Sequence, residues 1–266
     1  MHYDADVFAG FPAYYGNAYS HWASNLSGTG RMTTEPHYKP RDWASQPPYR
    51  YAGYKSTALR GPTRPLVPLK QTLSELTGPV YGHESVGPLD NDLTKNGVKD
   101  GEPLGERIVV TGRVLDENGR PVPDALIEIW QANAAGRYIH EVDQHDAPLD
   151  PNFFGGGRCV TDGEGHYRFY SVRPGAYPWG NHHNAWRPNH IHLSLFGAAL
   201  PARLVTQMFF PGDPLLDLDP IYQGVPEGAR ERLVSKFSID VTEPDFALGY
   251  VFDIVLRGRD ETPMET

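Results

Sequence analysis

The sequence has little cysteine, no excess of positive charge and no long apolar run, and each shortage excludes a class of protein. Cys159 is the single cysteine among 266 residues, so neither an intrachain disulfide nor a zinc site with several cysteines can form. The formal net charge of -9 argues against a nucleic-acid binder, because contacts to phosphates need a basic face. No stretch reaches the roughly 20 apolar residues of a membrane helix. The opening residues, MHYDADVFAGFPAYYGN, lack the apolar segment of a secretory signal, so we expect a soluble, cytoplasmic protein.

Glycine and proline are abundant instead, with 28 and 25 residues. Such a composition is typical of a chain with many turns and few long helices. Two strand-like runs lie within 108–132, joined by a turn at Asn118-Gly119, and 159–172 indicates a second hairpin around Gly163 and Gly165. Further strands are predicted at 189–197, 203–210 and 249–258, and helices at 65–79 and 226–237. The pattern predicts an all-β fold, a β-sandwich with long loops and few short helices.

The first 53 residues differ from the rest because they are rich in Tyr, Ser, Pro, Asn and Gly and have no sustained hydrophobic period. Their many aromatic residues argue against the alternative of a disordered tail, since such tails contain few aromatics. We therefore expect an N-terminal arm over 1–53 that packs on the core or on a partner chain. The catalytic domain is expected over 54–266.

Two histidines at alternate positions, His190 and His192, are the first candidates for chemistry. Side chains two apart on a strand point to the same face, so the two imidazoles are expected side by side, with Asn189, Ile191 and Leu193 opposite. This is a metal-ligand arrangement, although a polar surface face or a hydrogen-bonded core pair gives the same pattern.

Tyrosine is the other donor near these histidines. The window 177–195 contains no Asp or Glu, but Tyr177 lies in it and Tyr138 lies upstream. Two phenolates would favour Fe(III), because a phenol with a pKa of about 10 is deprotonated at neutral pH only beside a strongly charged ion. The alternative is that both tyrosines are ordinary core aromatics.

Four more residues are candidates for the cavity that these histidines and tyrosines would line. Arg187, which precedes Pro188, would stabilise negative charge on a substrate, or else form a surface salt bridge. Gln207 is expected on the next strand, facing the same cavity. Trp130 and Trp179 would line this cavity, and ordinary core packing is the alternative for both.

The segments IVVTGRVLDENGRPVPDALIEIWQANAAGRY, DPNFFGGGRCVTDGEGHYRFYSVRPGAYPW and NAWRPNHIHLSLFG resemble the intradiol ring-cleavage dioxygenases. The likeness runs from about Tyr54 to Arg257, and within the family it is closest to the β chains of the two-chain type that acts on protocatechuate. These segments contain, in this order, a single Tyr, then Tyr-Pro-Trp, then Trp-Arg-Pro-x-His-Ile-His. This series is highly specific for the family. The resemblance implies one non-haem Fe(III) in each copy of this chain, held by Tyr138, Tyr177, His190 and His192.

It also implies an activity: cleavage of protocatechuate by O2 between its hydroxyl-bearing carbons, giving 3-carboxy-cis,cis-muconate in the β-ketoadipate pathway of aromatic catabolism. Tyr177 would leave the iron when the substrate binds and take up one of its protons. Arg187 and Gln207 would assist the reaction, and Tyr54 matches a residue near the substrate carboxylate.

The two-chain type implies a partner, a homologous α chain that lacks the iron ligands and forms a larger hetero-oligomer with this one. Three alternatives stay open at this point. One is a related enzyme that acts on catechol or hydroxyquinol, another is a non-catalytic transthyretin-like binding module, and the third is a zinc or copper site on the two histidines. Residues 1–35 match nothing recognisable in the family.

Overall fold

The computed structural model describes residues 44–53, 55–56, 58, 61, 64, 85–183, 186–197 and 203–265. Within them, no helix has the length and apolar character needed to span a membrane. The helix predicted at 65–79 lies outside the described residues, as does most of the predicted N-terminal arm.

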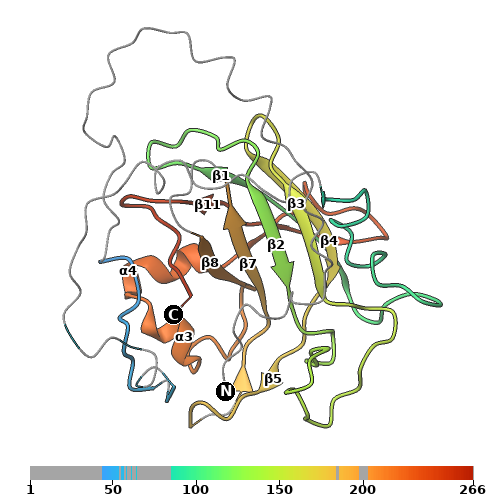
Figure 1. Ribbon diagram of the computed structural model, residues 1–266, viewed down its shortest axis with the longest axis horizontal. Coiled ribbons are helices and arrows are strands. Elements are labelled where there is room, and N and C mark those ends of the chain that lie inside the picture. Colours follow the sequence, from blue (N-terminus) through green and yellow to red (C-terminus); the bar gives the residue numbers. More distant parts are fainter. Residues whose placement is uncertain are drawn as a thin grey trace, which may run out of the picture. The chain divides into compact units, whose positions relative to one another are not determined.

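Two sheets pack face to face, so the predicted β-sandwich is confirmed (Figure 1). The first sheet contains β1 (Arg107–Leu115), β4 (His166–Val172), β9 (Lys236–Phe237), β10 (Leu248–Val251) and β11 (Ile254–Val255). The second sheet has the order β3 (Gly156–Val160), β2 (Leu126–Trp130), β7 (His190–Phe196) and β8 (Leu204–Phe209). Two short strands, β5 (Tyr177–Pro178) and β6 (Trp186–Arg187), form a separate antiparallel ribbon.

The pairing of the first four strands differs from the two hairpins that the sequence suggests. Both turns exist, and Gly119 and Gly165 occupy them with φ of +74° and +75°. After each turn, however, the chain crosses to the opposite sheet, so that β1 pairs with β4 and β2 pairs with β3. A tight turn fixes only the local reversal of the chain, whereas the partner of each strand is decided by which faces bury the core.

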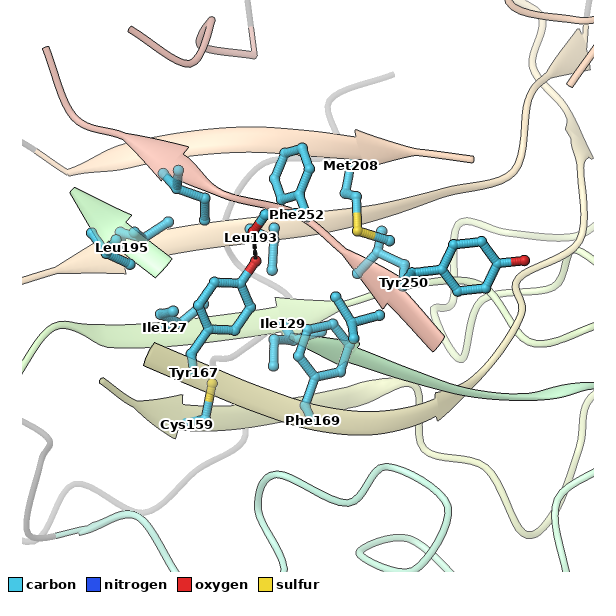
Figure 2. Packing of buried hydrophobic residues seen from close by; sticks show 14 of the residues in the cluster. Ile127, Ile129, Cys159, Tyr167, Phe169, Leu193, Leu195, Met208, Tyr250 and Phe252 are labelled. Atoms are coloured by element: carbon cyan, nitrogen blue, oxygen red, sulfur yellow. Dashed lines mark hydrogen bonds between the residues drawn. The ribbon is translucent and has the colours of Figure 1, made fainter. Parts of the chain in front are cut away.

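The core lies between the sheets and is built from the alternate residues of each strand. Figure 2 shows Ile127 and Ile129 of β2 beside Tyr167 and Phe169 of β4, and Leu193 and Leu195 of β7 belong to the same core. Because these β7 residues and Ile191 are fully buried in the core, His190 and His192 project from the opposite, outer face of the second sheet. Strand β7, an interior strand of the second sheet, therefore anchors the two histidines to the core of the fold.

The outer face of β8 is covered by α3 (Pro220–Gly224), α4 (Glu227–Arg230) and a 3₁₀ turn, η3 (Glu231–Leu233) (Figure 1). Phe209 packs there against Val225, Ala229 and Leu233. The single helix predicted over 226–237 is too long. It ends at Leu233, because Ser235 then donates its backbone N–H to the Phe209 carbonyl and the chain continues as strand β9.

Candidate metal centre and active site

The two histidines lie between side chains of the neighbouring strands. In the register of the second sheet, His192 is opposite Trp130 on β2 and opposite Gln207 on β8. The Trp130 indole stacks on the His192 imidazole, with ring centroids 4.8 Å apart and planes 6° apart. His190 and His192 are 2% and 6% exposed, so the alternative of a polar surface face is excluded for this pair.

The β5–β6 ribbon brings Tyr177 and Arg187 to the same place, because these two residues are opposite each other in its register. The Tyr177 hydroxyl oxygen lies 3.5 Å from His190 Nε2 and 3.5 Å from Arg187 Nη1. Tyr177 thus stands between the imidazole and the guanidinium. It is 5% exposed.

Tyr138 comes from the loop after β2 and packs edge-on against Tyr177, with ring centroids 5.3 Å apart. The Asp143 carboxylate fixes this loop by accepting a hydrogen bond from the Tyr138 backbone N–H at 2.8 Å. Gly136 allows the close approach, since its φ is +79° and a Cβ there would lie 2.1 Å from the carbonyl oxygen of Ala176. The glycine therefore lets the Tyr138 loop and the Tyr177 strand lie together.

The hydrogen bonds of the two imidazoles fix their tautomers. His190 Nδ1 lies 2.7 Å from the Pro188 carbonyl oxygen, and His192 Nδ1 lies 2.9 Å from Glu265 Oε2. Both partners accept hydrogen bonds, so both Nδ1 atoms carry the hydrogen. Each Nε2 then presents a lone pair, and the two Nε2 atoms are only 3.2 Å apart.

Two lone pairs that face each other in a buried site repel unless a cation lies between them. A proton is disfavoured, because burial, with Arg187 and His192 adding to the effect, lowers the pKa of His190 well below its ordinary value. A metal ion suits the gap better, since nitrogens that each lie about 2.1 Å from one ion are about 3.0–3.4 Å apart. The donor set of this site therefore fits a metal.

The tyrosines decide which kind of metal the site fits. Within the described part of the chain, no three His, Cys, Asp or Glu side chains gather around one point as metal ligands would. Burial raises the pKa of the Tyr138 phenol well above its ordinary value, and Tyr177 raises it further. Only an ion of high charge would hold such phenols as phenolates, which favours a trivalent metal over zinc.

Arg187 forms a buried ion pair. The alternative that the sequence left open, a surface salt bridge, is therefore wrong. Its Nε lies 2.7 Å from Asp219 Oδ1, and the two side chains are 2% and 0% exposed. Its Nη2 donates to Gln207 Oε1 at 2.6 Å, and its guanidinium carbon lies 5.1 Å from the centre of the Trp179 ring. Burial alone would lower the pKa of Arg187, but Asp219 outweighs it and raises that pKa, so the charge is permanent.

Two acidic residues at this site were missed by the sequence analysis, namely Asp219 and Glu265. Asp219 caps α3, and its side chain accepts from the Tyr222 N–H. The pair Asp219-Pro220 is a typical helix start, a signal that would have located the cap but not its contact with Arg187. For Glu265, 73 residues from His192 in sequence, no local pattern gives a signal.

The structure thus brings together eight of the nine predicted site residues. They are Trp130, Tyr138, Tyr177, Trp179, Arg187, His190, His192 and Gln207. The ninth, Tyr54, lies outside the described residues. Close to it in sequence, Tyr51 packs against the aromatic cluster of the site, and the Ser56 N–H donates to Asn181 Oδ1 at 2.9 Å.

Comparison with known proteins gives the relatives of the chain. A family model described as "Dioxygenase" matches residues 76–258, and one described as "Protocatechuate 3,4-dioxygenase beta subunit N terminal" matches residues 40–72. The protocatechuate 3,4-dioxygenase beta chain of Burkholderia cepacia is 70% identical over 226 residues, which are 85% of this chain and 96% of that one.

Two further relatives are more distant. The protocatechuate 3,4-dioxygenase alpha chain of Pseudomonas putida is 31% identical over 74% of this chain and 97% of its own length. The hydroxyquinol 1,2-dioxygenase of Rhizobium sp. (strain MTP-10005) is 34% identical over 50% of this chain and 45% of its own length. The family match and the 70% identity agree with the resemblance seen in the sequence, and the chain belongs to the intradiol ring-cleavage dioxygenases, in the branch of the protocatechuate 3,4-dioxygenase β chains.

Proposed function

We propose that this chain is the iron-binding subunit of a protocatechuate 3,4-dioxygenase. It cleaves protocatechuate with O2 between the two hydroxyl-bearing carbons and yields 3-carboxy-cis,cis-muconate. The observation that carries the proposal is the pair of Nε2 lone pairs 3.2 Å apart, with Tyr177 beside them. The 70% identity to a β chain of that enzyme supports the choice of substrate.

In this proposal, one Fe(III) is held by Tyr138, Tyr177, His190 and His192. When bound, ferric iron supplies a Lewis acid that favours the deprotonated form of both substrate hydroxyls and makes the ring electron-rich. Tyr177 accepts one of the released protons at its phenolic oxygen. Its place beside Arg187 suits this role, because the guanidinium 3.5 Å away stabilises the phenolate until the proton arrives.

Arg187 has a second role, which is to stabilise negative charge on the substrate ring. Its guanidinium is held by Asp219 on one edge and by Gln207 on another, so it cannot turn away when the charge of the site changes. Such preorganised charge lowers a barrier without any cost of reorientation. Gln207 both holds this arginine and orients the intermediates of the reaction.

Substrate recognition is assigned to the aromatic wall and to the segment near Tyr54. Trp130 and Trp179 flank the site from two sides, the first on His192 and the second under Arg187. Tyr54 is proposed to contact the substrate carboxylate. A homologous α chain is proposed as the partner, in agreement with the existence of separate alpha and beta chains among the relatives.

The test is made on the protein purified after co-expression with an α chain. Its iron content is measured, and its visible spectrum is recorded before and after protocatechuate is added without oxygen. A tyrosinate-to-iron band that shifts with the substrate, followed by uptake of one O2 per protocatechuate and formation of the muconate, is the expected result. Colourless protein, or protein that contains iron but consumes no O2 with protocatechuate, would refute the proposal.

Catechol and hydroxyquinol are the competing substrates, because relatives that carry those names match part of the chain. The comparison is made through kcat/KM for protocatechuate, catechol and hydroxyquinol in the same preparation. Protocatechuate is expected to be preferred, and Tyr54→Phe should reduce that preference while affecting catechol less. A higher kcat/KM for catechol in the unaltered protein would transfer the assignment to the other branch of the family.

A further inference from the structure

Glu265 contacts His192 on the side of the ring that faces away from the proposed iron. Its Oε2 lies 2.9 Å from Nδ1, and the two side chains are 21% and 7% exposed. The Nδ1 hydrogen of His190 goes instead to a backbone carbonyl, that of Pro188 two residues away. The two imidazoles are therefore oriented differently, one by the backbone just before its own strand and the other by a distant acidic residue.

The segment that carries Glu265 is held firmly against β8. The Glu265 N–H donates to the Val205 carbonyl at 2.8 Å, and Thr206 Oγ1 donates to the Pro263 carbonyl at 2.7 Å. Gln46 also holds this segment. Its amide nitrogen donates to Glu261 Oε1 at 2.7 Å, and its amide oxygen accepts from the Met264 N–H at 2.8 Å. The carboxylate is thus presented to His192 by an ordered backbone.

The contact also fixes where the hydrogen of the His192 ring lies. A glutamate carboxylate accepts hydrogen bonds, so the 2.9 Å contact with Glu265 places the hydrogen on Nδ1 and leaves the lone pair on Nε2. A carboxylate on the outer nitrogen of a ligating imidazole also strengthens the imidazole as a donor.

We propose that Glu265 is a positioning residue of the metal centre, which fixes the tautomer of His192, orients its ring and increases its donor strength toward the metal. Gln46 and the segment 261–265 then belong to the support of the site. The inference rests on the proposed function for the identity of the metal. Its alternative is a merely structural contact that stabilises the fold and leaves the metal unaffected.

The experiment compares Glu265→Ala, Glu265→Gln and Gln46→Ala with the unaltered protein, each co-expressed with the α chain. Glu243→Gln is the matched control, because Glu243 is also a half-buried carboxylate, hydrogen-bonded at 2.6 Å to the Tyr170 hydroxyl on the first sheet, away from the site. Three quantities are measured without turnover. They are the rate of iron loss to a chelator, the Fe(III)/Fe(II) reduction potential, and the unfolding of the iron-free protein in denaturant.

Loss of such a partner typically reduces metal affinity about 10- to 100-fold, and we expect iron loss from Glu265→Ala to accelerate by a factor in that range. Glu265→Gln retains a hydrogen-bond acceptor without the charge, so its iron loss should be intermediate. Its reduction potential should be more positive, because a weaker imidazole donor stabilises Fe(III) less. Gln46→Ala should change both quantities in the same direction by less, and Glu243→Gln should change neither.

Two results would overturn the inference. One is that both Glu265 variants lose iron at the same rate as the unaltered protein and have the same reduction potential. The other is faster iron loss that only parallels a loss of folding stability, with the potential unchanged, which would make the contact structural. Failure of the proposed function is seen separately, because it is decided by the iron content and O2 uptake of the unaltered protein.

Discussion

The guanidinium of Arg187 and the carboxylate of Asp219 form a bidentate ion pair that is almost completely excluded from water. Nε lies 2.7 Å from Oδ1 and Nη2 lies 3.3 Å from Oδ2. Removing one partner of such a pair leaves the other as an uncompensated buried charge, which costs about 3–5 kcal/mol. The pair therefore links the stability of the fold to the charge that the proposed reaction requires.

A single variant and a double variant separate these two roles. Arg187→Met should lower the free energy of unfolding by about 3–5 kcal/mol, and Arg187→Met with Asp219→Asn should recover most of that loss, because Asn removes the buried charge and can still cap α3. Turnover should stay slow in both, with a barrier raised by about 2–4 kcal/mol. Denaturant unfolding and kcat are measured on the same iron-loaded preparations. Recovery of kcat in the double variant would show that Arg187 acts only through stability.

The sequence predicts the positions of the two histidines of this site correctly. The alternation of β7 predicts that His190 and His192 share one face with Ile191 and Leu193 on the other, and the structure places them so. This succeeds because the period of a strand is a local property. The assignment of iron to these residues stays a prediction, which the donor set of the site supports.

The failures are all non-local. The turns at Gly119 and Gly165 are predicted, but the strands on either side of each turn pair in different sheets. Asp219 and Glu265 reach Arg187 and His192 from 32 and 73 residues away, and nothing in the local sequence indicates these contacts. The helix predicted over 226–237 fails for the same reason, because its second half is diverted by a hydrogen bond to β8.

Tyr138 is expected to contribute a phenolate-to-iron absorption band. Tyr138→Phe should remove that contribution and shift the colour of the iron-loaded protein, since the ring is kept and only the oxygen is lost. Tyr170→Phe is the control, because Tyr170 is hydrogen-bonded to Glu243 on the first sheet and should leave the visible spectrum unchanged. The spectra are compared at equal iron content. A Tyr138→Phe spectrum that superimposes on that of the unaltered protein would exclude Tyr138 as a ligand.

Cys159 should be inert in the folded protein. Burial raises the pKa of its thiol to about 12, so at pH 8 only about one molecule in ten thousand carries the reactive thiolate. We expect no labelling by iodoacetamide at pH 8 until denaturant is added, and then one label per chain. A Glu164→Cys variant, with its thiol in the exposed turn between β3 and β4, should acquire one label while folded. Rapid labelling of the unaltered native protein would contradict the buried position of Cys159.

Gly136 and Gly119 form a matched pair for testing how the Tyr138 loop is held against the Tyr177 strand. Both have positive φ, +79° and +74°, but a Cβ at Gly136 would meet the Ala176 carbonyl oxygen at 2.1 Å, whereas a Cβ at Gly119 has nothing within 4 Å. Alanine at either position costs about 1 kcal/mol for the left-handed backbone. Only Gly136→Ala must also push the loop and the strand apart.

We therefore expect Gly119→Ala to reduce the free energy of unfolding by about 1 kcal/mol and to retain iron fully. Gly136→Ala should cost about 1–3 kcal/mol more, and it should lose iron to a chelator faster, because Tyr138 and Tyr177 no longer meet at one point. Denaturant unfolding and iron-release kinetics of the two variants provide the comparison. If both variants lose the same stability and release iron at the same rate, the contact at Ala176 does not position the tyrosines, and other contacts of the loop, such as the hydrogen bond from the Tyr138 N–H to Asp143, must do so.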